Sequence, residues 1–419
     1  MPANGIGRTD GYLTSAEIEA IVAAGIESLH LDGQRVLVIV PDGTRTMPLP
    51  HMHALLTRHL LPRAAAMDYL IALGTHSPMD DTALTRHFGA PVSGGLLGQS
   101  RVYNHRWMDP QTFVQLGVIP AEEIHDLSGG LFAQEVPVRL NRLVLDYDRL
   151  LVVGPVFPHE VVGFSGGSKY FFPGIAGAEI INFTHWLGAV MTNHSIIGSG
   201  YTPVRAVIDR AAAMIPTPAA CFALVVTHEG TAGLFYGSPQ EAWQAASALS
   251  AHKHIVYVER PYRRVLSVMP RLYDDLWTGA KGMYKMEPAV ADGGEVVIYA
   301  PHISEVSYSH GKILDEIGYH TRDYFLKQWE RFQHHPWGVL AHSTHVKGLG
   351  EYDAATQVET PRIQVTLATA IPPERCRRIN LGYLDPASVG LEDWQGREEE
   401  GVLLVPRAGE MLYRLKEKV

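Results

Sequence analysis

Short runs of branched apolar residues alternate with amphipathic segments along most of this chain. The runs at 35–40, 69–73 and 150–157 indicate buried strands, and the segments at 15–29, 50–66 and 79–88 are predicted to be helices. Repeats of strand, polar turn and helix place successive strands parallel in one sheet, with helices on its faces. The chain is therefore predicted to be an α/β protein with mainly parallel sheets.

The same alternation continues toward the C-terminus. Further strands are predicted at 112–118, 136–146, 221–227, 255–259, 264–268, 295–300, 338–341, 362–367 and 401–406, and further helices at 204–214, 239–252, 273–290 and 312–335. Because 419 residues are too many for one core, we expect two α/β domains, 1–260 and 261–419, with the active site in a cleft between them. The last helix of the second domain can then pack against the first domain.

Composition excludes several classes of protein. The chain is 46% hydrophobic and 19% charged, which is typical of a soluble globular protein. It has no apolar run of membrane-spanning length, and its N-terminus lacks the apolar core of a signal peptide. The net charge of −9 without a basic cluster argues against nucleic acid as a partner. Two distant cysteines, Cys221 and Cys376, favour a reducing compartment, so a cytoplasmic location is expected.

Polar side chains follow three of the predicted strands. Asp42 and Arg45 follow the first, His76 follows the second, and His159 follows the third. Arginine binds a carboxylate or phosphate as a planar fork, and two histidines facing one substrate could pass a proton in both directions. The alternatives are a turn with a surface ion pair and a histidine that merely begins a helix.

A glycine-rich turn at 163–167 precedes Lys169, and His185 lies sixteen residues beyond that lysine. Glycines let backbone N–H groups approach an anion, and a lysine in an apolar setting is a candidate for covalent chemistry. Loops at the carboxyl ends of strands are where open α/β sheets bind ligands. The alternative is a loop with a solvated lysine and surface histidines.

Taken jointly, these segments have an order and spacing that resemble the nickel-pincer lactate racemase family. The resemblance covers most of the chain, most strongly over 36–190, and rests on Asp42-Gly43-Thr44-Arg45, Gly74-Thr75-His76, His159, Lys169 and His185.

The resemblance implies a cofactor. Family members hold a nickel-pincer nucleotide, a pyridinium-3,5-bisthiocarboxylic acid mononucleotide with Ni(II), attached to a lysine that matches Lys169. The histidine matching His185 is the metal ligand, and one imidazole suits a square-planar nickel site. The segment matching Asp42, Gly43, Thr44 and Arg45 touches the cofactor.

The resemblance also implies catalytic and substrate residues. His76 and His159 match the two acid–base histidines, and Arg45 matches a residue near the substrate carboxylate. In the second domain, Lys281 matches a substrate-binding lysine, while Thr278 stands where the lactate enzyme has glutamine. This departure favours a substrate larger or more polar than lactate. The stretch 342–348, with His342, His345 and Lys347, is expected at another strand end, either as a structural turn or lining the pocket for the substrate's tail.

The sequence therefore predicts a racemase or epimerase of a 2-hydroxy acid, which depends on separate cofactor-biosynthesis enzymes for loading. Three alternatives remain: a sugar-acid (aldonate) 2-epimerase on the same scaffold, lactate racemase itself, and a cofactor-binding protein without turnover. The presence of both His76 and His159 argues against the last. A nicotinamide dehydrogenase is disfavoured because the strand–GxGxxG–helix unit is missing.

Overall fold

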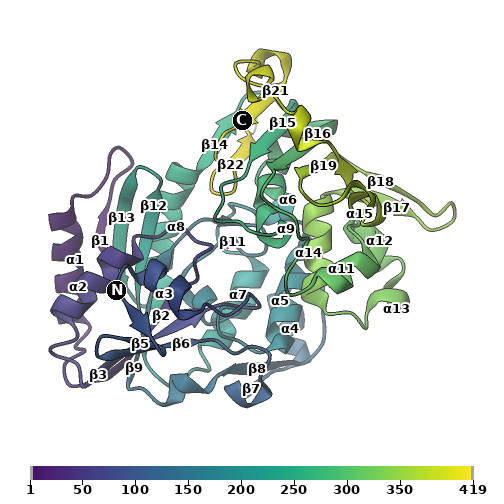
Figure 1. Ribbon diagram of the computed structural model, residues 1–419. Coiled ribbons are helices and arrows are strands. Elements are labelled where there is room, and N and C mark those ends of the chain that lie inside the picture. The colour runs from purple at the N-terminus through teal and green to yellow at the C-terminus, as the bar shows by residue number, and fades with distance from the viewer. Residues whose placement is uncertain (1–2, 417–419) are drawn as a thin grey trace. The chain divides into compact units, whose positions relative to one another are not determined.

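In the computed structural model, which describes residues 3–416, the chain folds into two compact units (Figure 1). Unit 1 comprises the residues up to 157 with 164–181 and 203–253, and unit 2 comprises 158–163, 182–202 and the residues from 254 onward. The units interleave along the chain. The predicted domains 1–260 and 261–419 and the cleft between them stay predictions.

Unit 1 is built around a nine-stranded sheet of order β1-β13-β12-β9-β2-β3-β6-β5-β4. Its strands, with the separate pair β7 and β8, are β1 (Asn4–Gly7), β2 (Arg35–Pro41), β3 (Ala66–Ala72), β4 (Val92–Ser93), β5 (Leu96–Leu97), β6 (Ser100–Asn104), β7 (Phe113–Ile119), β8 (Val136–Asn141), β9 (Arg149–Pro155), β12 (Ala219–Thr227) and β13 (Gly230–Gly237). Its helices are α1 (Ser15–Ser28), α2 (Leu49–His59), α3 (Asp81–Phe88), α4 (Ala121–Leu127), α7 (Pro203–Ala212) and α8 (Pro239–His254), with the short helices η1 (Pro110–Thr112), η2 (Arg142–Leu145) and η3 (Gly167–Tyr170).

The centre of this sheet is parallel, as predicted. Strands β12, β9, β2, β3 and β6 run in one direction, and β13 and β1 add an antiparallel edge. The chain leaves β2 toward β3 and β6, whereas β9 and β12 lie on the other side of β2, so the strand order reverses between β2 and β9. Ligands of open α/β sheets bind outside the carboxyl ends of the strands at such a reversal.

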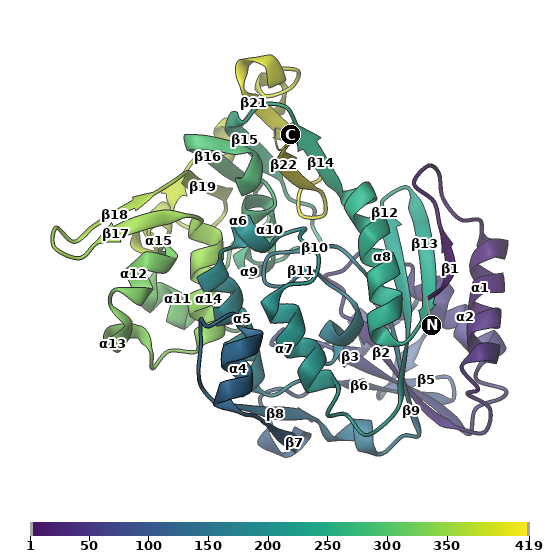
Figure 2. The ribbon, with the colours of Figure 1, turned by 180° about the vertical axis from the view of Figure 1, so that it is seen from behind.

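Helices cover both faces of the sheet. Val36, Val38 and Val40 join the core formed with α1 and α2, while the intervening Leu37 and Ile39 are also fully buried. Burial on both faces explains why β2 is a continuous apolar run rather than an alternating one. Figure 2 shows α7 and α8 on the face opposite α1.

Unit 2 contains a parallel five-stranded sheet of order β20-β19-β16-β15-β21 and the pairs β14–β22 and β17–β18. Its strands are β14 (Ile255–Val258), β15 (Tyr262–Val268), β16 (Val290–Ala300), β17 (Gly350–Asp353), β18 (Val358–Pro361), β19 (Gln364–Thr369), β20 (Gly382–Tyr383), β21 (Val402–Val405) and β22 (Leu412–Leu415). Its helices are α6 (Asn193–Ile196), α9 (Leu276–Gly279), α10 (Lys281–Tyr284), α11 (Gly311–Ile317), α12 (Arg322–Leu326), α13 (Trp329–Phe332), α14 (Trp337–Lys347) and α15 (Pro373–Arg378), with η4 (Glu287–Ala289), η5 (Pro386–Ser388), η6 (Leu391–Asp393) and η7 (Glu398–Glu400).

The chain passes between the units beside β10 (Pro158–His159), within β11 (Gly163–Phe164) and α5 (Ala178–Met191), at the start of α7 and at the end of α8. Within residues 3–416, no helix combines the length and the apolar character needed to cross a bilayer. The last element of that range is strand β22, so the predicted final helix is not found there.

Three predictions of secondary structure in unit 2 are wrong. The run 338–341 is not a strand but part of helix α14, which follows Pro336 and is buried over most of its surface, so its apolar run carries no amphipathic pattern. The predicted helix 273–290 is three short pieces, α9, α10 and η4. The predicted helix 312–335 is likewise broken into α11, α12 and α13, with Gly318 in a left-handed conformation after α11.

Several predicted boundaries shift by a few residues. Helix α1, predicted over 15–29, ends at Ser28 and is capped by Thr14, whose side chain forms a capping box with Glu17. The helix predicted over 50–66 ends at His59, and the strand predicted over 136–146 ends at Asn141 and continues as η2.

Candidate functional site

Asp42 is a buried carboxylate at the carboxyl end of β2. Its Oδ1 accepts hydrogen bonds from the Thr44 amide at 3.1 Å and from Thr44 Oγ1 at 2.6 Å. Arg45 Nη1 in turn donates to Thr44 Oγ1 at 2.9 Å. Burial by itself would raise the pKa of Asp42, but the charge and hydrogen bond of His76, together with Arg45 and Thr44, outweigh it and lower the pKa well below its ordinary range.

His76 is bound to the other oxygen of this carboxylate. Its Nδ1 donates to Asp42 Oδ2 at 2.5 Å, and its backbone carbonyl accepts from Trp107 Nε1 at 2.9 Å. Pro41 is paired with Ala72 across β2 and β3, so the segments that follow these strands emerge at one edge of the sheet. Because Nδ1 carries the proton, the neutral imidazole keeps its lone pair on Nε2, which is the form of a general base.

Lys169 lies on η3, after a turn in which Gly166 and Gly167 both have positive φ, 89° and 59°. An added Cβ at Gly166 would approach Val156 Cγ2 to 2.5 Å, so glycine is required there for space as well as for conformation. Helix η3 packs against the end of β2. The phenol of the next residue, Tyr170, is buried there, close enough to feel the charges of Arg45 and Asp42.

Unit 1 thus brings together one predicted set of site residues. Asp42, Thr44, Arg45 and His76 form a bonded chain of side chains, and the Lys169 turn lies after β9, the strand next to β2. The set therefore occupies the reversal of strand order. Gly43 lies in the middle of it, and an added Cβ there would meet only Met79 Cε, at 3.8 Å.

His159 and His185 belong to unit 2. His159 is buried, and its Nδ1 accepts the amide N–H of Val161 at 3.1 Å. Glu160 Oε2 also lies 3.3 Å from that nitrogen, but an amide N–H can only donate, so Nδ1 must hold its lone pair. The neutral ring therefore carries its proton on Nε2, which makes the ground-state tautomer of His159 the opposite of that of His76.

His185 lies on α5 near a group of histidines on other elements of unit 2. Burial, followed by the charges of His345, His310 and His185, lowers the pKa of His342 well below its ordinary value. His342 stacks on Trp277 with ring centroids 4.0 Å apart. Contrary to the prediction, His342, His345 and Lys347 do not lie at a strand end but on helix α14, where all three are buried.

Thr278 and Lys281 follow β15, on the short helices α9 and α10. Thr278 is buried, and its hydroxyl donates to Asp275 Oδ1 at 3.0 Å as part of the cap of α9. Lys281 Nζ lies 4.4 Å from the centroid of the Tyr273 ring, a cation–π contact. The hydroxyl of Thr278 is thus already engaged within the protein.

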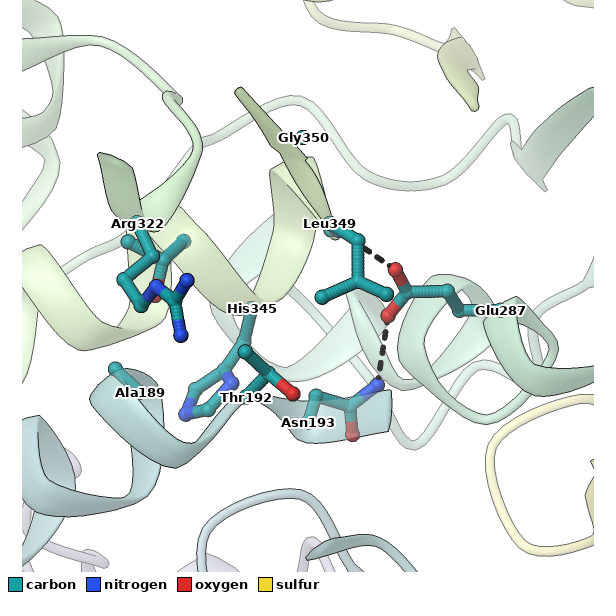
Figure 3. Close-up of a pocket in the computed structure, with 10 residues that line it drawn as sticks. Ala189, Thr192, Asn193, Glu287, Arg322, His345, Leu349 and Gly350 are labelled. Atoms are coloured by element: carbon teal, nitrogen blue, oxygen red, sulfur yellow. Dashed lines mark hydrogen bonds between the residues drawn. The ribbon is translucent and has the colours of Figure 1, made fainter. Parts of the chain in front are cut away.

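Unit 2 also contains a small polar pocket, shown in Figure 3, at the end of α5. A water can occupy about 20 Å³ of it, which is room for about one molecule. Asn193 Nδ2 donates to Glu287 Oε2 at 3.0 Å, and Leu349 N donates to Glu287 Oε1 at 2.7 Å. Two buried atoms, Asn193 Oδ1 and His345 Nε2, have no hydrogen-bond partner within the described residues. Burial lowers the pKa of His345 to about 4, against the opposing charge of Glu160.

Thr192 lines this pocket in a strained conformation, with φ 77° and ψ 140°. Only glycine adopts this region readily. We expect Thr192→Gly to raise the free energy of unfolding by about 1 kcal/mol, because relief of strain outweighs the added chain entropy of glycine. Denaturant titration of Thr192→Gly beside Thr192→Ala measures this, since alanine removes the hydroxyl but keeps the strain. Equal stability of the two variants would contradict the prediction.

Beyond the predicted set, the structure identifies residues that the sequence reasoning missed. Trp107 holds the backbone of His76, and Arg205 holds the turn before Lys169. Arg205 could have been noticed, because it stands between Val204, Val207 and Ile208 in a helix whose apolar face they define. Among residues 3–416, no group of three or more His, Cys, Asp or Glu side chains is placed to hold a metal ion.

Comparisons with known proteins find several that are similar to this chain. Residues 14–198 match the family described as lactate racemase N-terminal domain. Over 162 residues, the chain is 27% identical to a lactate racemase from Lactiplantibacillus plantarum and 26% identical to one from Thermoanaerobacterium thermosaccharolyticum. Each match covers 38% of this chain and 34% of the relative, so the chain spans about a third of the length of the relatives it matches.

Two solved structures are similar over nearly the whole chain. A crystal structure of a protein from Thermotoga maritima has 32% identity and a TM-score of 0.89, covering 96% of this chain and 99% of that one. The lactate racemase apoprotein from Thermoanaerobacterium thermosaccharolyticum has 18% identity and a TM-score of 0.72, covering 98% and 95%. At that identity, the second likeness shows a shared fold.

Proposed function

We propose that this chain, which belongs to the lactate racemase-like family, is an isomerase that racemises or epimerises a 2-hydroxy acid. One observation carries the proposal. The Asp42–His76 pair lies at the reversal of strand order in a parallel sheet, one strand away from the turn that carries Lys169. A base oriented by a buried carboxylate is what removal of a hydroxyl proton requires.

The residues present fit the nickel-pincer nucleotide that the resemblance implies. Lys169 offers an amine for covalent attachment, and Arg45 offers a guanidinium for an anionic group. An added Cβ at Gly43 would meet only Met79 Cε, at 3.8 Å, so a bound group could approach the backbone closely there. His185 would be the protein's ligand to the metal. When bound, this group supplies the acceptor and donor of the α-hydrogen.

The chain's own residues handle the proton and the carboxylate. His76, with the lone pair on Nε2, would take the proton of the substrate hydroxyl, and Asp42 would stabilise the imidazolium that forms. In the opposite direction of the reaction, His159 in its imidazolium form would serve as an acid that donates the proton on Nε2. Two histidines in complementary states suit a reaction that must run both ways. Arg45 and Lys281 would bind the substrate carboxylate.

The substrate is proposed to be larger than lactate. The hydroxyl of Thr278 is engaged by Asp275. Because threonine is shorter than the glutamine of the lactate enzyme, a substrate with a longer tail than the methyl group of lactate would fit better beside it. An aldonate is a 2-hydroxy acid with a longer tail, so epimerisation of a sugar acid is the second candidate function. Location in the cytoplasm and dependence on enzymes that make the cofactor belong to the same proposal.

A panel of single-enantiomer 2-hydroxy acids tests the function. Protein made in a host that synthesises the cofactor should carry a nucleotide-sized mass increase at Lys169 and interconvert at least one pair of enantiomers, followed by chiral chromatography. We expect lactate to have a kcat/KM about tenfold or more below that of the best longer acid, the usual worth of a poorly filled pocket. Lactate as the best substrate would contradict the argument from Thr278, and no racemisation of any acid by adduct-bearing protein would contradict the function.

A further inference from the structure

A buried arginine, Arg205, donates hydrogen bonds to the backbone of the turn before Lys169. Arg205 on α7 is 1% exposed, and its guanidinium donates to Phe164 O at 2.6 Å and to Gly166 O at 3.1 Å. The two carbonyls lie on either side of Ser165, so one planar fork spans the turn. A buried guanidinium is costly unless it is hydrogen-bonded, and here both of its terminal nitrogens donate to the backbone of the turn.

A single tryptophan, Trp243, packs against both this arginine and the turn. The guanidinium carbon lies 4.2 Å from the centroid of the Trp243 ring on α8. The same tryptophan closes the space beside Gly167, where an added Cβ would come within 2.7 Å of Trp243 Cβ and 2.8 Å of Pro239 O. The glycines therefore bend the chain tightly against Arg205 and Trp243.

Two further contacts tie the turn and η3 to β9 and to the segment that follows it. Ser165 Oγ accepts the amide N–H of Phe157 at 2.9 Å. Tyr170, next to Lys169, lies over Gly154, where an added Cβ would come within 1.9 Å of the phenol oxygen. Two consecutive glycines are flexible by themselves, so the fixed direction of η3 depends on these contacts, with Arg205 at their centre.

We propose that Arg205 is a positioning residue: by fixing the Phe164–Gly166 carbonyls, it sets the direction in which Lys169 presents its amine for covalent attachment. This inference rests on the proposed function, because it assigns a purpose to the geometry of that lysine. A lysine that becomes part of a cofactor linkage must point consistently, since a displacement of about 1 Å at the attachment point can cost about 10²-fold in rate.

Two measurements on the apoprotein test positioning without any bound cofactor. The first is the rate at which Lys169 is acylated by an amine-reactive ester, by peptide mass spectrometry relative to Lys253. The second is amide hydrogen exchange over 164–170. In Arg205→Met we expect acylation of Lys169 to change by about fivefold or more and exchange to rise by about tenfold or more, because the turn is released.

Arg210→Met is the matched control. Arg210 lies on the same helix but binds Glu123 on α4, away from the turn. The Arg210→Met variant should leave the acylation of Lys169 and the amide exchange over 164–170 unchanged. Arg205→Lys, which cannot span two carbonyls as a fork, should fall between wild type and Arg205→Met. If Arg205→Met does not fold, Trp243→Leu releases the same guanidinium and is expected to act in the same direction.

A third measurement separates this proposal from the function on which it rests. In a host that makes the cofactor, the fraction of folded protein carrying an adduct at Lys169 should fall about fivefold or more in Arg205→Met and stay constant in Arg210→Met. Wild-type protein that never carries an adduct would overturn the proposed function. Folded Arg205 variants with wild-type acylation, exchange and adduct fraction would overturn the role of Arg205.

Discussion

Lys169→Ala should leave the protein without a covalently bound nucleotide and reduce racemisation to the background of buffer alone. Under the proposed function, the amine of Lys169 is the point of attachment, and hydride transfer is chemistry that a cofactor rather than amino-acid side chains supplies. The loss should therefore be the largest of any single substitution, about 10⁶-fold or more on the usual scale of enzymatic acceleration. Intact-protein mass and chiral chromatography of the same preparation measure both effects.

Two companion variants make this result specific. Lys169→Arg keeps the positive charge but has no primary amine, so it should also lack the adduct. Lys253→Ala removes another lysine of unit 1, one that donates to Gly11 O near the surface, and should keep both adduct and activity. Racemisation by adduct-free Lys169→Ala at the wild-type rate would refute the covalent cofactor while leaving an isomerase to be explained.

Much of unit 1 could be predicted from the sequence, because its parallel strands are buried on both faces and appear as separate apolar runs. The positions of Asp42 and His76 just after β2 and β3 followed from those runs. Their bond did not, since 34 residues separate them and only the register of β2 with β3 brings their side chains to one edge. The apolar pattern of the sequence therefore predicts the strands, whereas the contact between the two side chains depends on how the strands are paired.

Unit 2 was harder to predict for two physical reasons. Helix α14 is buried over most of its surface, so its sequence carries no amphipathic signal and its short apolar run resembled a strand. The segment 273–290 contains Gly279, Gly282 and Pro288, and these break a helix that composition alone had suggested. His342 and His345 were therefore assigned to the wrong kind of element.

Arg205 illustrates a further limit. A charged residue in a helical segment is ordinarily solvated. The apolar neighbours of Arg205 on α7 indicate its burial, but nothing in the sequence identifies Trp243 as the ring that it packs against. Its hydrogen-bond partners are main-chain carbonyls, and because every residue has such a carbonyl, the sequence cannot show which ones are bound. A search for sequence motifs therefore does not find residues whose role is to fix the backbone through hydrogen bonds.

Asp42→Asn should lower racemisation by about 10²-fold or more while leaving the adduct at Lys169 intact. The carboxylate accepts the Nδ1 proton of His76 and so keeps the lone pair on Nε2. An amide is neutral and can instead donate to Nδ1, which favours the tautomer that cannot act as a base. The fall should appear mainly in kcat, because Asp42 acts on the base rather than on the substrate.

A double-mutant cycle with His76→Ala tests this assignment. If Asp42 acts through His76, Asp42→Asn should cost little further activity once His76 is gone. Additive losses would mean that Asp42 has a separate role, such as contact with the cofactor.

The stability of the same variant should depend on pH in one direction. The folded state lowers the pKa of Asp42, so the ionised carboxylate stabilises the protein above its ordinary pKa of about 4, and that contribution is lost as the pH falls through the lowered value. The difference in free energy of unfolding between wild type and Asp42→Asn should therefore be largest near neutral pH and shrink below about pH 4. Denaturant titrations at a series of pH values measure it. A difference that stays constant down to the acid limit would show that Asp42 is not held as a carboxylate by His76, and the base assigned to His76 would lose its support.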